Sequence, residues 1–124
     1  MPKRVLIVDD NEHLRQILGS ILRSAGYEIS EAASAREAIA NAIATSPNLI
    51  LLDLDLPDMK GTDAAQALTK NATTAHIPII GCSAFFGAEW RAEALRSGMV
   101  DYLVKPISAA VIKARIEKFI LAES

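Results

Sequence analysis

LILLDLDLPDMKG, which runs from Leu49 to Gly61, opens with four consecutive apolar residues and turns acidic at Asp53. A short apolar run bounded by turn-forming residues is typical of a strand that is buried on both faces of a parallel sheet. With the preceding residue included, the run predicts a strand over Asn48–Asp53. Further segments, most of them rich in Val, Ile or Leu, predict four more strands: Arg4–Val8, Tyr27–Glu31, Pro78–Cys82 and Val100–Val104.

Helical patterns separate these strands. The clearest is an apolar stripe that we expect to close against the sheet, formed by Leu14, Ile17, Leu18, Ile21, Leu22 and Ala25. Gly26 is predicted to end that helix, and Ser34 with Glu37 has the spacing of a capping box at the start of the next. Later helices are predicted over about Thr62–Lys70, over Ala88–Ser97, and through Ile112, Ile116, Phe119 and Ile120.

The alternation of strands and helices indicates an α/β fold of the (βα)5 type. Parallel strands that are linked by helices have right-handed crossovers. Five such units are too few to close an eight-stranded barrel. The sequence therefore predicts an open, doubly wound parallel sheet.

Length and composition indicate one globular domain. The chain has 124 residues and a net charge of −2, and 51% of its residues are hydrophobic. This length suits a single core, and this charge gives no sign of a nucleic-acid partner. The apolar runs are too short for a signal peptide or a membrane span, and Cys82 is a lone cysteine. We therefore expect a cytoplasmic protein with no membrane partner.

Reactive side chains stand at the ends of four predicted strands. Asp9 and Asp10 follow the first strand, Asp53 ends the third, Ser83 follows the fourth and Lys105 follows the fifth. Because the carboxyl ends of parallel strands open on the same edge of a sheet, these residues are predicted to converge there. Asp9 and Asp10 alone would more often be loop or capping residues, but the whole set predicts a phosphoryl-transfer site.

Three carboxylates in one crevice would repel one another and require a cation. A like-charged pair about 5 Å apart costs roughly 3 kcal/mol at an effective dielectric of 20. Asp9, Asp10 and Asp53 are hard oxygen ligands with no Cys or His among them, which favours Mg²⁺ or Mn²⁺ over zinc. With Lys105 and Ser83 at the same edge, Asp53 is predicted to act as a nucleophile and to form an aspartyl phosphate.

In order and spacing, these motifs resemble those of the receiver domain of bacterial two-component response regulators. The segments that carry the resemblance are VLIVDDN at Val5–Asn11, the stretch Leu49–Gly61, CSA at Cys82–Ala84 and YLVKP at Tyr102–Pro106. The resemblance runs nearly end to end and implies a flavodoxin-like fold with strand order 2-1-3-4-5. It also implies that residues 1–124 are one receiver domain without an output domain.

The resemblance assigns roles to the acidic residues and the lysine. Asp53 matches the phosphoacceptor of the family. Asp9, Asp10, Asp53 and the backbone carbonyl of Asp55 match its Mg²⁺ ligands. Lys105 matches a ligand of the phosphoryl group.

Further roles concern the last two strands. Ser83 matches the second phosphoryl ligand, and Tyr102 matches an aromatic switch that turns inward when Ser83 is drawn toward the phosphoryl group. The bond between Lys105 and Pro106 is typically cis in this family, and the penalty for cis before proline is low.

Two residues beside the site are predicted to tune the lifetime of the phosphorylated form. Phe85 lies two residues after Ser83, where we expect it to shield the acyl phosphate from water. Asp55 lies two residues after Asp53 and adds a carboxylate beside the path of attacking water. The sequence leaves the sign of the effect of Asp55 open.

As a receiver, the chain would take its phosphoryl group from a histidine kinase or a phosphotransfer protein. The signal would leave through protein contact or onward phosphotransfer. The face formed by the predicted helix Ala88–Ser97, the strand Val100–Val104 and the last predicted helix would be used most readily. The chain is not expected to turn over a separate substrate. It would catalyse its own phosphoryl transfer and slow dephosphorylation.

Two alternatives stay open at this point. Asp53, Leu54 and Asp55 resemble the D-x-D motif of haloacid-dehalogenase-type phosphatases, although that family places the motif on the first strand of a longer chain. A receiver-like interaction module that is never phosphorylated is the second alternative, and its ligand set would usually be degraded.

Overall fold

The computed structural model describes residues 2–123 and contains the predicted alternation of strands and helices. The strands are β1 (Arg4–Val8), β2 (Glu28–Ala32), β3 (Leu49–Asp53), β4 (Ile79–Ser83) and β5 (Asp101–Val104). The helices are α1 (Glu12–Ser24), α2 (Ala35–Thr45), α3 (Gly61–Lys70), α4 (Ala88–Arg96) and α5 (Ala109–Glu123). Among the described residues, no helix has the length and apolar character needed to cross a membrane.

All the strands pair in parallel in one sheet with the order β2-β1-β3-β4-β5. This confirms the doubly wound, flavodoxin-like fold. The register sets Asp53 beside Cys82, and Ser83 beside Val104. The carboxyl ends of β1, β3, β4 and β5 therefore lie next to one another along one edge.

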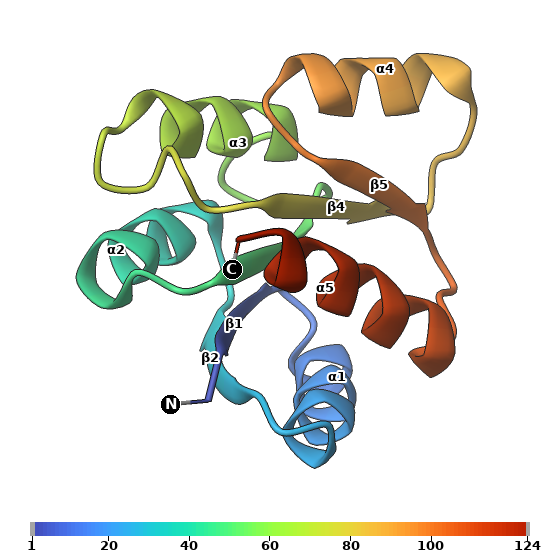
Figure 1. Cartoon of the computed structure of the whole chain (residues 1–124). Coiled ribbons are helices and arrows are strands. Elements are labelled where there is room, and N and C mark those ends of the chain that lie inside the picture. Colours follow the sequence, from blue (N-terminus) through green and yellow to red (C-terminus); the bar gives the residue numbers. More distant parts are fainter. Residues whose placement is uncertain (1, 124) are drawn as a thin grey trace.

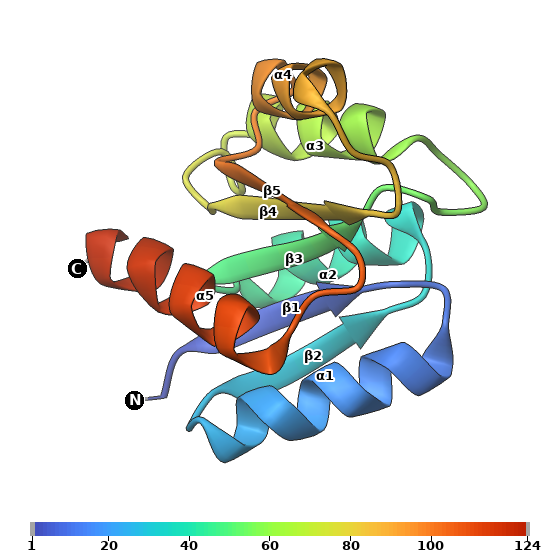
Figure 2. The ribbon, with the colours of Figure 1, turned by 90° about the vertical axis from the view of Figure 1, so that its right-hand side faces the viewer.

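Helices cover both faces of the sheet. α1 and α5 lie on one face, and α2, α3 and α4 lie on the other (Figure 1, Figure 2). Successive strand residues point to opposite faces, so Leu6 and Leu52 join the core under α2–α4, while Ile7 and Leu51 join the core under α1 and α5. The central strands are buried on both sides, as their continuous apolar runs predict.

Four strands begin one residue later than predicted. β2 starts at Glu28 because the backbone N–H of Tyr27 donates to the carbonyl of Leu22 at 3.1 Å. This bond ties Tyr27 to the last turn of α1. β3, β4 and β5 start at Leu49, Ile79 and Asp101. Because β4 also extends one residue further, Ser83 is its last residue instead of the first residue of the following loop.

The predicted helix signals of α1 and α2 are confirmed. Gly26, with a φ of 97°, follows the C-cap of α1. The hydroxyl of Ser34 accepts the backbone N–H of Glu37 at 3.2 Å, and the Glu37 carboxylate accepts the N–H of Ala33 at 2.6 Å. The reciprocal bond of this capping box thus reaches one residue before the N-cap.

The apolar stripe of α1 is only partly closed against the sheet, which corrects the sequence prediction. Leu22 is fully buried, whereas Ile17 is 43% exposed and Ala25 is exposed. Part of the stripe, which includes Ile17, lines a groove of about 480 Å³ between α1 and the start of α5, together with residues such as Ile107 and Ile112. The helix therefore presents part of its apolar face to solvent.

Candidate functional site

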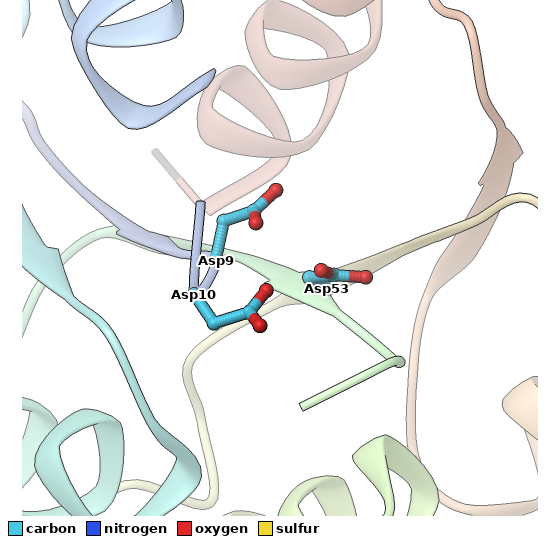
Figure 3. A group of neighbouring side chains, drawn as sticks. All are labelled: Asp9, Asp10 and Asp53. Carbon is cyan, nitrogen blue, oxygen red and sulfur yellow. The ribbon is translucent and has the colours of Figure 1, made fainter. Parts of the chain in front are cut away.

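Three carboxylates meet at the carboxyl ends of β1 and β3 (Figure 3). Oxygens from Asp9, Asp10 and Asp53 all lie within 4.8 Å of one another. Asp9 and Asp53 are each only 4% exposed, whereas Asp10 is exposed. The cluster is therefore anchored in the protein and open to solvent on one side.

Hydrogen bonds fix the two buried carboxylates. Asp9 Oδ1 accepts the N–H of Asn11 at 2.9 Å, and Asp53 Oδ1 accepts the N–H of Asp55 at 3.1 Å. The Nζ atom of Lys105 lies 3.2 Å from Asp9 Oδ2 and 3.4 Å from Asp53 Oδ2. The ammonium group therefore bridges the two carboxylates from the β5 side.

The electrostatics of these groups follow from burial and proximity. Burial and, to a smaller extent, the negative charges of Asp9 and Asp55 raise the pKa of Asp53, although the Asp55 N–H and Lys105 lower it. Burial alone would lower the pKa of Lys105, but the attraction of Asp53 and Asp9 raises it. Lys105 is therefore protonated throughout the neutral range of pH. Ionisation of the neighbouring Asp53 is disfavoured by its burial.

The donor set fits a hard divalent cation. The clustered atoms are carboxylate oxygens, and Lys105 offsets only part of their charge. Cations that prefer oxygen ligands bind to such sites and keep waters in their remaining positions. The exposed side at Asp10 leaves room for those waters and for oxygens of an incoming group.

Ser83 is joined to the loop after β3 and to the loop after β4. Its buried hydroxyl donates to Asp55 Oδ2 at 3.2 Å and accepts the N–H of Phe85 at 3.2 Å. The carbonyl of Ser83 accepts the N–H of Lys105 at 2.8 Å. The structure thus places Ser83 at the predicted edge, with its hydroxyl directed to Asp55.

Tyr102 is 5% exposed, and its hydroxyl donates to the carbonyl of Phe85. The ring of Phe85 stacks on Trp90 of α4, with 4.7 Å between centroids and 17° between planes. Contacts therefore run from β5 through the β4–α4 loop to α4. The Lys105–Pro106 bond is cis, as the family resemblance implies.

Two positioning contacts were not predicted from the sequence. Arg15 of α1 donates to the carbonyl of Asp9 at 2.6 Å. Asp58 accepts the N–H groups of Ala35 and Arg36 at 2.9 and 3.0 Å and so caps α2 from the loop after β3. The Ala35 bond is the main cause of the lowered pKa of Asp58. The Asp58 contacts join residues more than 20 positions apart in sequence, whereas Arg15 reaches back six residues to Asp9.

A buried carboxylate links the two helices that flank β5. Asp101, 3% exposed, accepts hydrogen bonds from Arg91 of α4 and Arg115 of α5. Burial alone would raise its pKa, but hydrogen bonds from Arg115, the Tyr102 main chain and Arg91 lower it. The face formed by α4, β5 and α5 is therefore held by an ion-pair network.

Cys82 is fully buried in the core under α1 and α5. Burial raises the pKa of its thiol to about 12. The thiolate is the reactive form of cysteine, so Cys82 is a packing residue.

Gly61→Ala is expected to lower the free energy of unfolding by about 1–3 kcal/mol. An added Cβ would lie 2.5 Å from the Cα of Leu54, and backbone cannot move aside as a side-chain tip can. Urea unfolding measures the loss. Gly19→Ala is the control, because the nearest atom to its Cβ is in the flexible Arg23 side chain at 3.1 Å. That variant should match or exceed wild type; equal stability of Gly61→Ala and wild type would contradict the prediction.

Comparisons with known proteins identify the family. The response regulator receiver domain model matches residues 5–117. Chemotaxis protein CheY of Thermotoga maritima is 36% identical over 119 residues, which cover 95% of this chain and 98% of CheY. Chemotaxis response regulator CheY4 of Vibrio cholerae has a similar structure, with a TM-score of 0.91, 28% identity, and coverage of 96% of this chain and 99% of that chain.

Longer relatives match over one part of their length. Response regulator PleD of Caulobacter vibrioides is 37% identical over 94% of this chain and 26% of PleD. The phosphate regulon transcriptional regulatory protein PhoB of Pseudomonas aeruginosa is 36% identical over 93% of this chain and 50% of PhoB. The chain thus spans about a quarter of the first relative and half of the second. These matches decide against the phosphatase alternative, and the chain belongs to the response regulator receiver domain family.

Proposed function

We propose that the chain is a phosphoacceptor of a two-component system and is phosphorylated on Asp53 in a Mg²⁺-dependent reaction. The observation that carries this proposal is the setting of Asp53. Its carboxylate lies 3.4 Å from the Lys105 ammonium and within 4.8 Å of carboxylate oxygens of Asp9 and Asp10. A nucleophile, a cation and a set of hard metal ligands therefore share one edge of the sheet.

The transfer forms and breaks one bond at phosphorus. An oxygen of ionised Asp53 attacks the phosphorus of a phosphohistidine on the donor protein, and the P–N bond breaks with its electron pair on the imidazole nitrogen. Asp9, Asp10, Asp53 and the main-chain carbonyl of Asp55 would hold Mg²⁺, which supplies neutralisation of the phosphoryl oxygens. Lys105 donates to a phosphoryl oxygen from the other side.

The signal would leave through protein contact on the α4–β5–α5 face. Tyr102 is a residue of β5, and its hydroxyl donates to Phe85 in the loop that follows Ser83. Once the Ser83 hydroxyl donates to the phosphoryl group, the β4–α4 loop must adjust, and Tyr102 and α4 adjust with it. A histidine kinase or phosphotransfer protein would supply the phosphoryl group.

Acetyl phosphate, a small phosphoryl donor, tests the proposal with the purified chain. We expect the intact mass to increase by one phosphoryl group in the presence of Mg²⁺ and to stay unchanged with EDTA. Treatment with hydroxylamine should remove the label, because hydroxylamine cleaves acyl phosphates. Absence of label with Mg²⁺ would refute the proposal and favour an interaction module.

Phe85→Ala is expected to shorten the lifetime of the phosphorylated form several-fold. Phe85 lines a pocket of about 290 Å³ together with Asp55 and Ser83, and removal of its ring would admit water to the acyl phosphate. Loss of label after removal of acetyl phosphate measures the lifetime. Phe86→Ala is the matched control, because Phe86 is 77% exposed. Equal decay of the two variants would contradict shielding by Phe85.

A further inference from the structure

The side chain of Asp55 contacts Ser83. The Ser83 hydroxyl donates to Asp55 Oδ2 at 3.2 Å, while the Asp55 N–H donates to Asp53 Oδ1 at 3.1 Å. The main chain of Asp55 therefore donates to Asp53, while its side chain accepts the hydrogen bond of the Ser83 hydroxyl.

The proton of the Ser83 hydroxyl is the mobile part of this arrangement. Ser83 is 1% exposed, its Oγ accepts the N–H of Phe85, and its carbonyl accepts the N–H of Lys105. A hydroxyl has a single proton to donate. Donation to Asp55 and donation to a phosphoryl oxygen on Asp53 therefore exclude each other.

We propose that Asp55 is a positioning residue that competes with the phosphoryl group for the Ser83 hydroxyl. The inference rests on the proposed phosphorylation of Asp53 and assigns a direction to the effect of Asp55. In the unphosphorylated chain, the charge-assisted bond to Asp55 stabilises one position of the Ser83 proton. Phosphorylation breaks that bond, so Asp55 lowers the ratio of phosphorylated to unphosphorylated chain at a given donor concentration.

The same exchange of hydrogen bonds extends to the β4–α4 loop. Ser83 Oγ is bound to the N–H of Phe85, whose carbonyl accepts the Tyr102 hydroxyl and whose ring stacks on Trp90. A change in the direction of the Ser83 hydroxyl therefore alters the contacts that hold this loop. The fluorescence of Trp90 is expected to report this change in hydrogen bonding, because its indole stacks on Phe85.

A purely electrostatic role of Asp55 makes a different prediction. Its negative charge would disfavour a phosphoryl group nearby even without contact to Ser83. Asp55→Asn removes that charge and keeps an acceptor oxygen for the hydroxyl, whereas Asp55→Ala removes both. The two variants therefore separate the hydrogen bond from the charge.

The test compares rate constants of labelling by acetyl phosphate in Mg²⁺ with rate constants of decay after its removal. We expect Asp55→Ala to raise the ratio of these constants about tenfold, which corresponds to ~1.4 kcal/mol. Asp55→Asn should raise it about threefold, because a neutral acceptor keeps about half the strength of a charged one. Asp63→Ala, which removes an exposed carboxylate from α3, is the control and should leave the ratio unchanged.

A double-mutant cycle with Ser83→Ala gives an independent measurement. Without the hydroxyl, Asp55→Ala should change the ratio less than about twofold. Asp55→Ala should alter the fluorescence emission of Trp90 in the wild-type background. In the Ser83→Ala background it should leave that emission unchanged. Thermal unfolding of each variant verifies its fold.

The outcomes are distinct. Equal ratios for Asp55→Ala and Asp55→Asn, or the same increase with and without Ser83, would show a charge effect and overturn the proposal. A wild-type ratio in Asp55→Ala would also overturn it. Absence of label on the wild-type chain would instead refute the proposed phosphorylation itself.

Discussion

Asp53→Asn is expected to abolish labelling by acetyl phosphate completely. An amide is not a nucleophile toward phosphorus under these conditions, and the remaining carboxylates are poorly placed to replace Asp53. Asp9 is bound by Asn11 and Lys105, and Asp10 is exposed at the rim. Intact mass measures the loss, and label retained on Asp9 or Asp10 would contradict the assignment of Asp53 as the acceptor.

The same substitution is expected to raise the stability of the metal-free chain at neutral pH. Burial raises the pKa of Asp53, so the folded state favours its protonated form. The stability that protonation provides is present at low pH and is lost as the pH rises through the folded pKa. At neutral pH the ionised group is therefore destabilising, and Asn removes this cost. Urea unfolding in EDTA measures the gain; Asp63→Asn, on exposed α3 surface, is the control and should show none.

Lys105→Met is expected to lower the initial rate of labelling by about 10²–10³-fold, the typical cost of removing one preorganised donor to a developing charge. Nζ of Lys105 lies within 3.4 Å of Asp53 Oδ2, so the ammonium is in place before the phosphoryl group arrives. Met keeps most of the length of the side chain and removes its charge. The rate is measured by intact mass at early times, with Lys113→Met on exposed α5 surface as the matched control.

Lys105→Met should also change how the chain responds to Mg²⁺. Without the ammonium, the ionised carboxylates of Asp9 and Asp53 face each other with no compensating charge from Lys105, which lowers stability in EDTA. Mg²⁺ should therefore stabilise Lys105→Met by more than it stabilises wild type. Equal labelling rates of the Lys105 and Lys113 variants, or equal stabilisation by Mg²⁺, would contradict the role given to Lys105.

The layout of the fold could be predicted because it depends on local patterns. The continuous apolar run of β3 requires burial on both faces, and the capping box at Ser34 and Glu37 marks a helix start within four residues. Strand ends were less accurate, since they depend on partners. Tyr27 is an aromatic residue, a type that is common in strands, yet its N–H donates to the carbonyl of Leu22 and β2 begins one residue later.

The proximity of the candidate site residues could be predicted, but most of their contacts could not. Residue type and position at strand ends brought Asp9, Asp53 and Lys105 together, because parallel strands share one edge. The direction of a side chain depends on tertiary packing. Nothing in the sequence shows that the Ser83 hydroxyl binds Asp55 instead of Asp53, or that the stripe of α1 stays half open beside the site.

The two loops that border the site differ in how they are held. In the loop after β3, Asp58 binds the start of α2, and a 3.2 Å hydrogen bond from the N–H of Gly61 to the carbonyl of Leu54 joins the two ends of the loop. The loop after β4 begins a run in which residues 84–91 are all exposed, and Phe85 links it to Ser83 and to β5. If Asp53 is phosphorylated as proposed, we expect the exposed loop after β4 to be displaced more than the loop after β3, so that α4 shifts relative to α3.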